Sequence, residues 1–279
     1  MSRLYVNGVN INVEVSGSGP PVLALHGFAG NLNTWDYFVK ETQTKYTVIR
    51  VDLLGHGSSD SPDDPLRYGV EHSVEDLVEI LDRLGISQSC WLGYSMGSRI
   101  ALVGATRVPD RCVGLVLEGA SPGLLNEEER LSRAQRDESL AKVILNEGLK
   151  WFVDYWEGLP LFETHAHLPV EVRASLRKQR LSNNIIGLSN SLRGAGVGNQ
   201  RPVHSLLSDL AIPVLCVIGE KDCKFMGIAD FMCRQFTHGH IEAISNAGHT
   251  PHLESPSEFN GVVLKFLQNL GSWDNFISG

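Results

Sequence analysis

The sequence predicts an α/β protein, with a mostly parallel sheet flanked by helices and interrupted by an all-helical cap insertion. Three observations lead to this fold class. Short β-branched and aliphatic runs alternate with amphipathic segments, as they do in βαβ units. Several of these runs are apolar throughout, which is typical of strands buried on both faces. From residue 127 to about 207 the alternation stops, and the chain is charged with a helical pattern.

The first element is a predicted hairpin. Asn7-Gly8 separates the alternating runs 4–6 and 11–15, and Asn-Gly is the strongest short-range signal for a two-residue hairpin loop. Further strands are expected at residues 22–25, 47–51, 90–92, 113–117, 213–218 and 240–244. Helices are expected at residues 32–41, 73–84, 98–107, 226–235 and 257–270. In the second of these helices, Ser73 is the expected N-cap and Gly85 the stop signal.

The break in the alternation predicts how the chain is divided. We expect residues 1–121 and 208–279 to form one α/β core, and residues 122–207 to form the helical cap inserted into it. A chain of 279 residues is long for one domain, but α/β folds of this length often form a single one.

Composition limits the classes of partner. The net charge of -8 argues against general affinity for nucleic acid or anionic membranes. No stretch approaches the roughly 20 apolar residues of a membrane helix, and the N-terminal residues lack the apolar core of a signal peptide. The five cysteines are interpreted as small buried hydrophobic residues in a reducing compartment. We therefore expect a cytoplasmic protein without nucleic-acid partners or membrane insertion.

Gly93-Tyr94-Ser95-Met96-Gly97 follows the predicted strand 90–92 and precedes a predicted helix. A Gly-x-Ser-x-Gly turn in this context exposes the serine hydroxyl, and its glycines leave room for the sharp bend. A serine hydroxyl is weakly reactive unless a neighbouring group takes its proton. The motif therefore has chemical meaning only if an acid and a histidine accompany it.

Asp222 and His249 supply that acid and histidine. Each follows a predicted strand, and the order serine, acid, histidine is the one that this type of fold uses. We expect Ser95 to act on the substrate, His249 to exchange its proton and Asp222 to fix the imidazole tautomer. Backbone amides of Phe28 and Met96 are the expected oxyanion-hole donors.

Other candidate sites fail on context. The pairs His165-x-His167, His238-x-His240 and His249-x-x-His252 lack the helical spacing and the glutamate of a zinc site, so no metal is expected. Residues 194–198 resemble a dinucleotide-binding loop, but no strand precedes them. Asp52 also follows a strand, but it precedes the serine and is interpreted as a structural loop residue.

These motifs resemble the α/β-hydrolase superfamily over nearly the whole chain. Within it, the sequence is similar to the 2-succinyl-6-hydroxy-2,4-cyclohexadiene-1-carboxylate (SHCHC) synthase family of menaquinone biosynthesis. The more discriminating matches are those in the insertion and Gly-Glu-Lys-Asp-Cys-Lys-Phe at 219–225. The matching segments are 26–30, 93–99, 118–124, 127–130, 152–157, 160–162, 180–183, 191–198 and 219–225. Val197 departs from the family pattern, in which a threonine is expected.

The resemblance implies an eight-stranded sheet and a cofactor-independent lyase that eliminates pyruvate from a small tricarboxylate substrate. In that reaction Ser95, activated by His249, acts as a base. Arg99 lies one helical turn after Ser95 and is expected at the same site. A guanidinium binds a carboxylate through two hydrogen bonds. The substrate-binding positions implied by the family are Tyr94, Arg99, Arg133, Trp156 and Arg180, with Arg130, Arg136, Arg177 and Arg193 as rival arginines.

Two alternatives stay open. One is a serine hydrolase of the same fold, a carboxylesterase or C–C bond hydrolase in which Ser95 is a covalent nucleophile. The other is a catalytically silent binding protein, which the complete set of Ser95, Asp222 and His249 disfavours. The fold class alone cannot separate a lyase from a hydrolase. A monomer or a small homo-oligomer is expected in either case.

Overall fold

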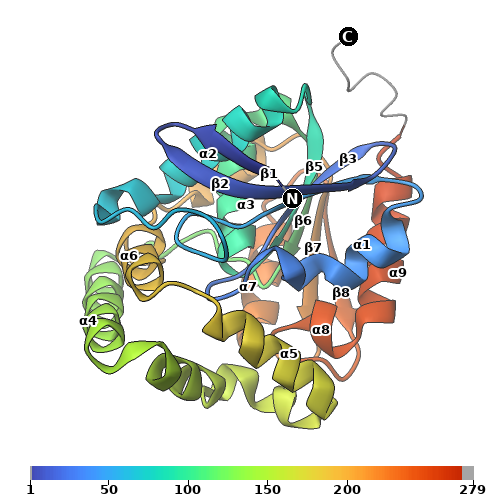
Figure 1. Cartoon of the computed structure of the whole chain (residues 1–279). Coiled ribbons are helices and arrows are strands. Elements are labelled where there is room, and N and C mark those ends of the chain that lie inside the picture. Colours follow the sequence, from blue (N-terminus) through green and yellow to red (C-terminus); the bar gives the residue numbers. More distant parts are fainter. Residues whose placement is uncertain (1, 272–279) are drawn as a thin grey trace.

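One eight-stranded sheet forms the centre of the molecule, in the order β1-β2-β4-β3-β5-β6-β7-β8 (Figure 1). The computed structural model describes residues 2–271. β1 and β2 pair antiparallel, β2 pairs antiparallel with β4, and all later pairings are parallel. The strands are β1 (Ser2–Val6), β2 (Val9–Gly17), β3 (Pro21–Leu25), β4 (Thr47–Val51), β5 (Ser89–Tyr94), β6 (Cys112–Glu118), β7 (Val214–Gly219) and β8 (Gly239–Ile244). The predicted fold class is confirmed.

Strand positions follow the sequence patterns closely. Asn7 and Gly8 both have positive φ, 45° and 89°, as the predicted two-residue hairpin loop requires. Every residue of β3, β5 and β7 is buried, which agrees with their continuously apolar sequences. In β1 only Val6 is buried, which agrees with the position of this strand at the edge of the sheet.

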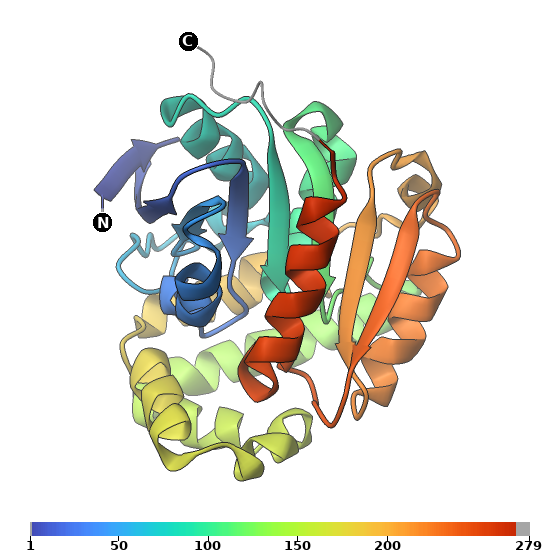
Figure 2. The same cartoon turned by 90° about the vertical axis from the view of Figure 1, so that its right-hand side faces the viewer.

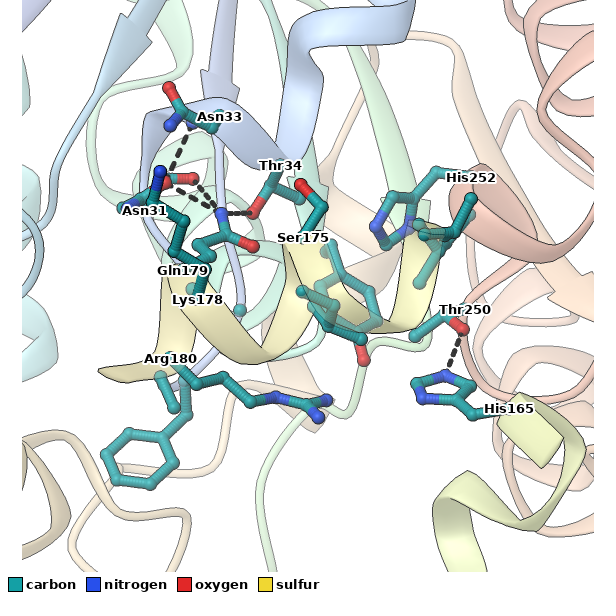
Figure 3. A pocket seen from close by; sticks show the side chains of 18 of the residues that line it. Asn31, Asn33, Thr34, His165, Ser175, Lys178, Gln179, Arg180, Thr250 and His252 are labelled. Carbon is teal, nitrogen blue, oxygen red and sulfur yellow. Dashed lines mark hydrogen bonds between the residues drawn. The ribbon is translucent and has the colours of Figure 1, made fainter. Parts of the chain in front are cut away.

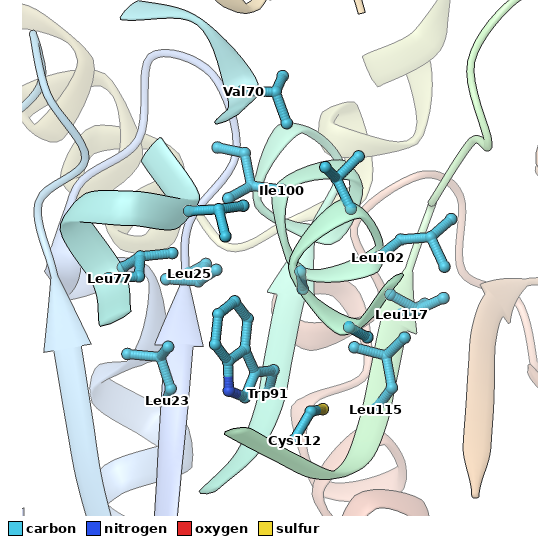
Figure 4. Packing of buried hydrophobic residues seen from close by; sticks show 14 of the residues in the cluster. Leu23, Leu25, Val70, Leu77, Trp91, Ile100, Leu102, Cys112, Leu115 and Leu117 are labelled. Carbon is cyan, nitrogen blue, oxygen red and sulfur yellow. The ribbon is translucent and has the colours of Figure 1, made fainter. Parts of the chain in front are cut away.

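Helices cover both faces of the sheet (Figures 1 and 2). α2 (Val70–Arg83), α3 (Met96–Arg107) and α7 (Cys223–Cys233) bury apolar residues in one large core, part of which is shown around Trp91 in Figure 4. α1 (Asp36–Thr42) and α9 (Pro256–Gln268) pack on the opposite face around Trp35 and Phe259. The short segments outside the cap are η1 (Leu32–Trp35), η2 (Pro65–Tyr68), η3 (Pro109–Arg111) and α8 (Pro251–Glu254).

Between β6 and β7 the structure has only helices, and the first four of them lie together at one end of the sheet (Figures 1 and 2). They are α4 (Glu127–Glu157), η4 (Pro160–His167), α5 (Val170–Leu181), α6 (Ile185–Ala195) and η5 (His204–Asp209). Gly148, with φ 84° and ψ 176°, interrupts α4. A separate apolar cluster around Phe152 and Leu188 holds this region together and includes Ala29 of the core. The position agrees with the expected cap, whose exact division at 122 and 207 stays a prediction.

Two helices, α2 and α7, begin three residues before their predicted starts. α2 begins at Val70, and Ser73 lies inside its first turn, where its hydroxyl donates to the carbonyl of Gly69. Gly69 is the N-cap, so the serine satisfies a helix carbonyl instead of capping an amide. α7 begins at Cys223 instead of 226, because the Asp222 carboxylate accepts from the Phe225 amide and caps the helix.

Candidate active site

Ser95 occupies a strained turn between β5 and α3. Its φ of 50° and ψ of -103° are unusual for a residue with a side chain. A Cβ on Gly97 would lie 2.3 Å from the carbonyl oxygen of Leu25, and one on Gly93 would lie 2.5 Å from the carbonyl of Gly97. The Ser95 amide donates to the carbonyl of Glu118, at 2.7 Å. Backbone packing therefore fixes the serine at the end of the central strands.

Asp222 and His249 lie beside this serine. His249 Nδ1 is 2.6 Å from Asp222 Oδ2, and His249 Nε2 is 3.3 Å from Ser95 Oγ. Because the carboxylate accepts a hydrogen bond from Nδ1, a neutral ring has a free acceptor at Nε2 for the serine hydroxyl. The structure thus brings together the three residues selected from the sequence.

Aromatic rings surround the imidazole. The His249 ring centroid is 4.5 Å from that of Phe225, 5.5 Å from that of Tyr94 and 6.3 Å from that of Phe162. His249 is 3% exposed and Asp222 is 8% exposed. Burial of this pair keeps water away from its hydrogen bond, which holds the ring more firmly than an exposed contact would.

Ser95 opens into a cavity of about 330 Å³, here called the Ser95 chamber. It is lined by Ser95 and His249, by the predicted oxyanion-hole residues Phe28 and Met96, and by Arg99. The other lining residues are Tyr94, Gly119, Ser121, Leu124, Arg133, Trp156, Leu161, Phe162, Ser191, Leu192, Ala195, Gly196, Val197, Lys224, Phe225 and Ile228. None of these residues, all within the described range 2–271, has a carboxylate side chain.

Arg99 is buried in the wall of this chamber. One guanidinium nitrogen donates to Gln200 Oε1 at 2.6 Å and the other to the carbonyl of Ala195 at 2.7 Å. Both acceptors are neutral, and no carboxylate of residues 2–271 forms an ion pair with it. Burial, together with the charge of the neighbouring Arg133, lowers the pKa of Arg99 to about 10. At neutral pH Arg99 is still a cation, and the nearby Asp137 raises its pKa while forming its ion pair with Arg133.

The other two predicted arginines differ from Arg99. Arg133 lines the Ser95 chamber, but its Nε also forms an ion pair of 2.9 Å with Asp137. Arg180 does not line the Ser95 chamber. Its guanidinium lies 3.2 Å from Glu157 and 5.3 Å from the centroid of the Phe162 ring. The structure therefore brings Arg99 and Arg133 to the serine and places Arg180 in a neighbouring cavity.

That second cavity, the Arg180 chamber, has a volume of about 470 Å³ and is shown in Figure 3. Phe28, Tyr94, Trp156 and Phe162 line both chambers and so form their common wall. The Arg180 chamber is strongly polar along α5 and η1. There the side-chain amide of Gln179 donates to Asn31 Oδ1 at 2.7 Å and to Thr34 Oγ1 at 3.0 Å. Tyr94 and Trp156, both predicted as binding residues, lie at this boundary.

The rival arginines serve mainly as links within the cap. Arg130 donates to the carbonyls of Leu124 and Leu125. Arg193 pairs with Glu138, Arg177 pairs with Asp154 and Glu157, and Arg136 donates to a carbonyl of its own helix. None of the four lines the Ser95 chamber.

Two buried histidines lie behind Phe28. His26 Nδ1 contacts the carbonyl of Gly27, and its Nε2 accepts from the amide of Leu53 at 3.0 Å. The His56 ring is 5.0 Å from the His26 ring and 5.7 Å from the Phe28 ring. Burial lowers the pKa of His26 to about 4 and that of His56 to about 3. These neutral rings support the loop that carries Phe28.

The rejected candidates have structural roles. The Asp52 carboxylate accepts from the amides of Leu32 and Ser58 and from the Asn12 side chain, which fits its interpretation as a loop residue. Within the described part of the chain, no cluster of metal-ligating side chains is present. Gly196 and Val197, from the Gly-rich segment, line the Ser95 chamber instead of forming a nucleotide loop. No helix of residues 2–271 is long and apolar enough to cross a bilayer.

The predicted burial of the cysteines is confirmed for three of the five. Cys90, Cys112 and Cys216 are buried, whereas Cys233 is partly exposed and Cys223 is exposed. Cys223 was misjudged because it follows the strand β7 and begins a helix, so its side chain is not part of the apolar run.

Sequence reasoning gave no role to several lining residues. Phe162 and Lys224 lie in segments that matched the family, but no local pattern showed which of their side chains face a cavity. His252, dismissed as a metal ligand, donates from its amide to the buried Glu118 carboxylate and places Nδ1 2.8 Å from it. The centroid of its ring lies 4.7 Å from that of the Tyr94 ring, so His252 supports the common wall of the two chambers.

Comparisons with known proteins agree with this architecture. Residues 20–256 match the family model described as alpha/beta hydrolase fold. A Bacillus subtilis protein that carries the name SHCHC synthase as a provisional assignment is 40% identical, over 94% of this chain and 99% of its own. The SHCHC synthase of Salmonella agona is 33% identical over 90% of this chain and 94% of its own. The structure titled MenH from S. aureus superposes with a TM-score of 0.89 at 32% identity, covering 94% of this chain and 99% of that one.

Proposed function

The chain belongs to the alpha/beta hydrolase fold family and, within it, to the SHCHC synthases, and on this premise we propose that it is a lyase of menaquinone biosynthesis. Its substrate would be 2-succinyl-5-enolpyruvyl-6-hydroxy-3-cyclohexene-1-carboxylate, from which it eliminates pyruvate to leave SHCHC. We further propose that the enzyme is cytoplasmic, needs no cofactor and works as a monomer or small homo-oligomer.

One observation carries the proposal. The Ser95 chamber contains the serine–histidine pair together with Arg99, Arg133 and Lys224, and no carboxylate lines it within the described residues. A cationic cavity is unexpected in a chain whose net charge is -8. It matches a substrate with three carboxylates, because guanidinium and ammonium groups bind carboxylates through charge-assisted hydrogen bonds.

The proposed reaction begins with proton abstraction. His249 Nε2 takes the hydroxyl proton of Ser95, and the Ser95 oxygen removes a proton from the ring carbon next to the succinyl ketone. The electron pair moves into an enolate, whose oxygen accepts hydrogen bonds from the amides of Phe28 and Met96. Asp222 stabilises the imidazolium that forms.

The second half of the reaction breaks the carbon–oxygen bond to the enolpyruvyl group. The enolate electron pair returns to form a double bond between C2 and C3, and the π pair of the existing C3–C4 double bond shifts to C4–C5. The C5–O bond then breaks, and the leaving group departs with the bonding pair as the enolate of pyruvate. His249 returns its proton to that leaving group, and the ring proton remains on the Ser95 oxygen. No water is consumed and no acyl-enzyme forms, so the serine is regenerated directly.

A serine hydrolase is the second candidate, because the 3.3 Å contact between Ser95 and His249 would equally activate a nucleophile. Two parallel assays separate the lyase from the hydrolase. One supplies the enolpyruvyl substrate and measures pyruvate release, and the other measures hydrolysis of p-nitrophenyl butyrate. We expect rapid pyruvate release and slow ester turnover. Rapid ester turnover without pyruvate would refute the lyase and favour the hydrolase.

A further inference from the structure

Lys224 is the cation of the Ser95 chamber to which the sequence motifs gave no role. It lies in the first turn of α7, two residues after Asp222, and it lines the chamber with Ser95 and Arg99. We propose that Lys224 forms a third carboxylate subsite of this chamber and takes the substrate carboxylate that Arg99 and Arg133 leave unbound. This inference rests on the proposed function and deepens it.

The position of Lys224 relative to the reacting groups is the first argument. Its Nζ lies 5.3 Å from the centroid of the Phe225 ring, and that ring lies 4.5 Å from the His249 ring. Asp222, Lys224 and Phe225 all lie at the start of α7, so one short segment carries the acid, the lysine and a ring that contacts the imidazole. A carboxylate held by Lys224 would be fixed relative to the imidazole, because the N-cap hydrogen bond of Asp222 holds this turn in place.

The charge environment is the second argument. No carboxylate within residues 2–271 forms an ion pair with Lys224, whereas Arg133, Arg177, Arg180 and Arg193 of the cap each have one. Lys224 is an exposed residue, so its ammonium group stays hydrated in the free enzyme. A cation with no internal partner at the wall of a cavity is available to a ligand, whereas one already paired has to be released first.

The number of cations is the third argument. Arg133 is close enough to Arg99 to lower its pKa, and both line the chamber, so they form one cationic end of it. Arg180 faces the other chamber and is paired with Glu157. Lys224 comes from a different element, α7, and supplies positive charge away from the helices that carry the two arginines. A substrate with three carboxylates therefore finds its third cation in Lys224 instead of Arg180.

Substitution of Lys224 by methionine tests the subsite, since methionine preserves length and removes charge. With the enolpyruvyl tricarboxylate we expect KM to rise about tenfold while kcat changes less, and Lys224→Arg to recover most of the loss. The rise should shrink at high salt, because an exposed charge is screened. The matched control is Lys221→Met, which removes a neighbouring lysine that does not line the chamber.

A second pair of substrates separates this inference from the proposed function. p-Nitrophenyl hemisuccinate carries a carboxylate that p-nitrophenyl butyrate lacks, and both report on the same serine. We expect Lys224→Met to lower the ratio of kcat/KM for hemisuccinate over butyrate about fivefold, whether or not the wild type releases pyruvate. If neither the tricarboxylate KM nor this ratio differs between the Lys224→Met and Lys221→Met variants, Lys224 is not a carboxylate subsite. Failure of the wild type to release pyruvate would refute the lyase alone.

Discussion

His249 is held more closely by Asp222 than by Ser95: its Nδ1 is 2.6 Å from the carboxylate, and its Nε2 is 3.3 Å from the hydroxyl. The carboxylate has a second contact, because it also accepts from the amide of Phe225 and caps α7. Asp222 thus connects the orientation of the imidazole to the start of the helix that carries Lys224. A substitution at this position can separate the two roles.

Asp222→Asn is expected to remove the catalytic role and keep the cap. Asparagine is as good an N-cap as aspartate, so the melting temperature should change little. Its amide cannot stabilise the imidazolium and favours the wrong tautomer, which should lower kcat by roughly 10³–10⁴-fold. Steady-state kinetics and thermal unfolding measure the two effects. A loss of stability in Asp222→Ala but not in Asp222→Asn would confirm the cap; full activity in Asp222→Asn would refute the catalytic role.

Ser95→Gly should stabilise the protein while abolishing activity. Ser95 has a φ of 50°, which costs a residue with a side chain on the order of 1 kcal/mol and costs glycine little. Ser95→Ala removes the same hydroxyl and retains the strain. Thermal unfolding of the two inactive variants is therefore the measurement, with the glycine variant expected to melt at the higher temperature. Equal melting temperatures would show that the turn stores no such strain.

The glycines on either side of Ser95 are expected to tolerate no side chain. A Cβ at Gly97 would lie 2.3 Å from the backbone oxygen of Leu25, so Gly97→Ala should cost at least about 3 kcal/mol of unfolding free energy. Gly227→Ala is the matched control, because Gly227 lies inside α7 with no atom within 4 Å of the added Cβ. It should gain about 0.5–1 kcal/mol from helix propensity. Chemical denaturation of both variants checks the contrast.

The sequence was sufficient for the sheet and for the three central residues of the site. Strands such as β3 and β7 were located because buried parallel strands have continuous apolar runs, and Ser95, Asp222 and His249 were selected because each follows a predicted strand. The cap was less predictable. Whether Arg180 or Lys224 faces the serine depends on how helices pack over the strand ends, and helical periodicity does not contain that information. Ser73 was misassigned because a serine can bond either a helix amide or a helix carbonyl.

Stability should fall in mild acid because of His26 and His56. Their pKa values in the folded protein, about 4 and about 3, lie below the ordinary value of about 6.5, so the unfolded chain binds more protons below pH 6.5. The free energy of unfolding therefore decreases as the pH falls from about 6.5 towards 4, by up to about 3 kcal/mol for each imidazole. Protonation of His26 Nε2 would also displace the Leu53 amide.

Denaturant titrations between pH 7.5 and 4.5 measure this dependence. His56→Leu should reduce the loss of stability by about half, because leucine fills the site without a titrating group and His26 remains. His238→Gln is the matched control, since it replaces an exposed imidazole. If His56→Leu and wild type lose stability in parallel, the acid sensitivity comes from other groups.

A substitution at Gln200 can neutralise the charge of Arg99 while the shape of the site is kept. Gln200 Oε1 accepts from the Arg99 guanidinium at 2.6 Å, and Gln200 is 2% exposed. Gln200→Glu is nearly isosteric and places a carboxylate at the same point, so it should form a buried ion pair that competes with the substrate. We expect kcat/KM for the tricarboxylate to fall by roughly 10–100-fold, with no loss of melting temperature. Gln200→Leu, which removes the contact without adding charge, should reduce turnover less than Gln200→Glu does. The opposite order would mean that Gln200 positions Arg99 and that the net charge at this end of the chamber is unimportant.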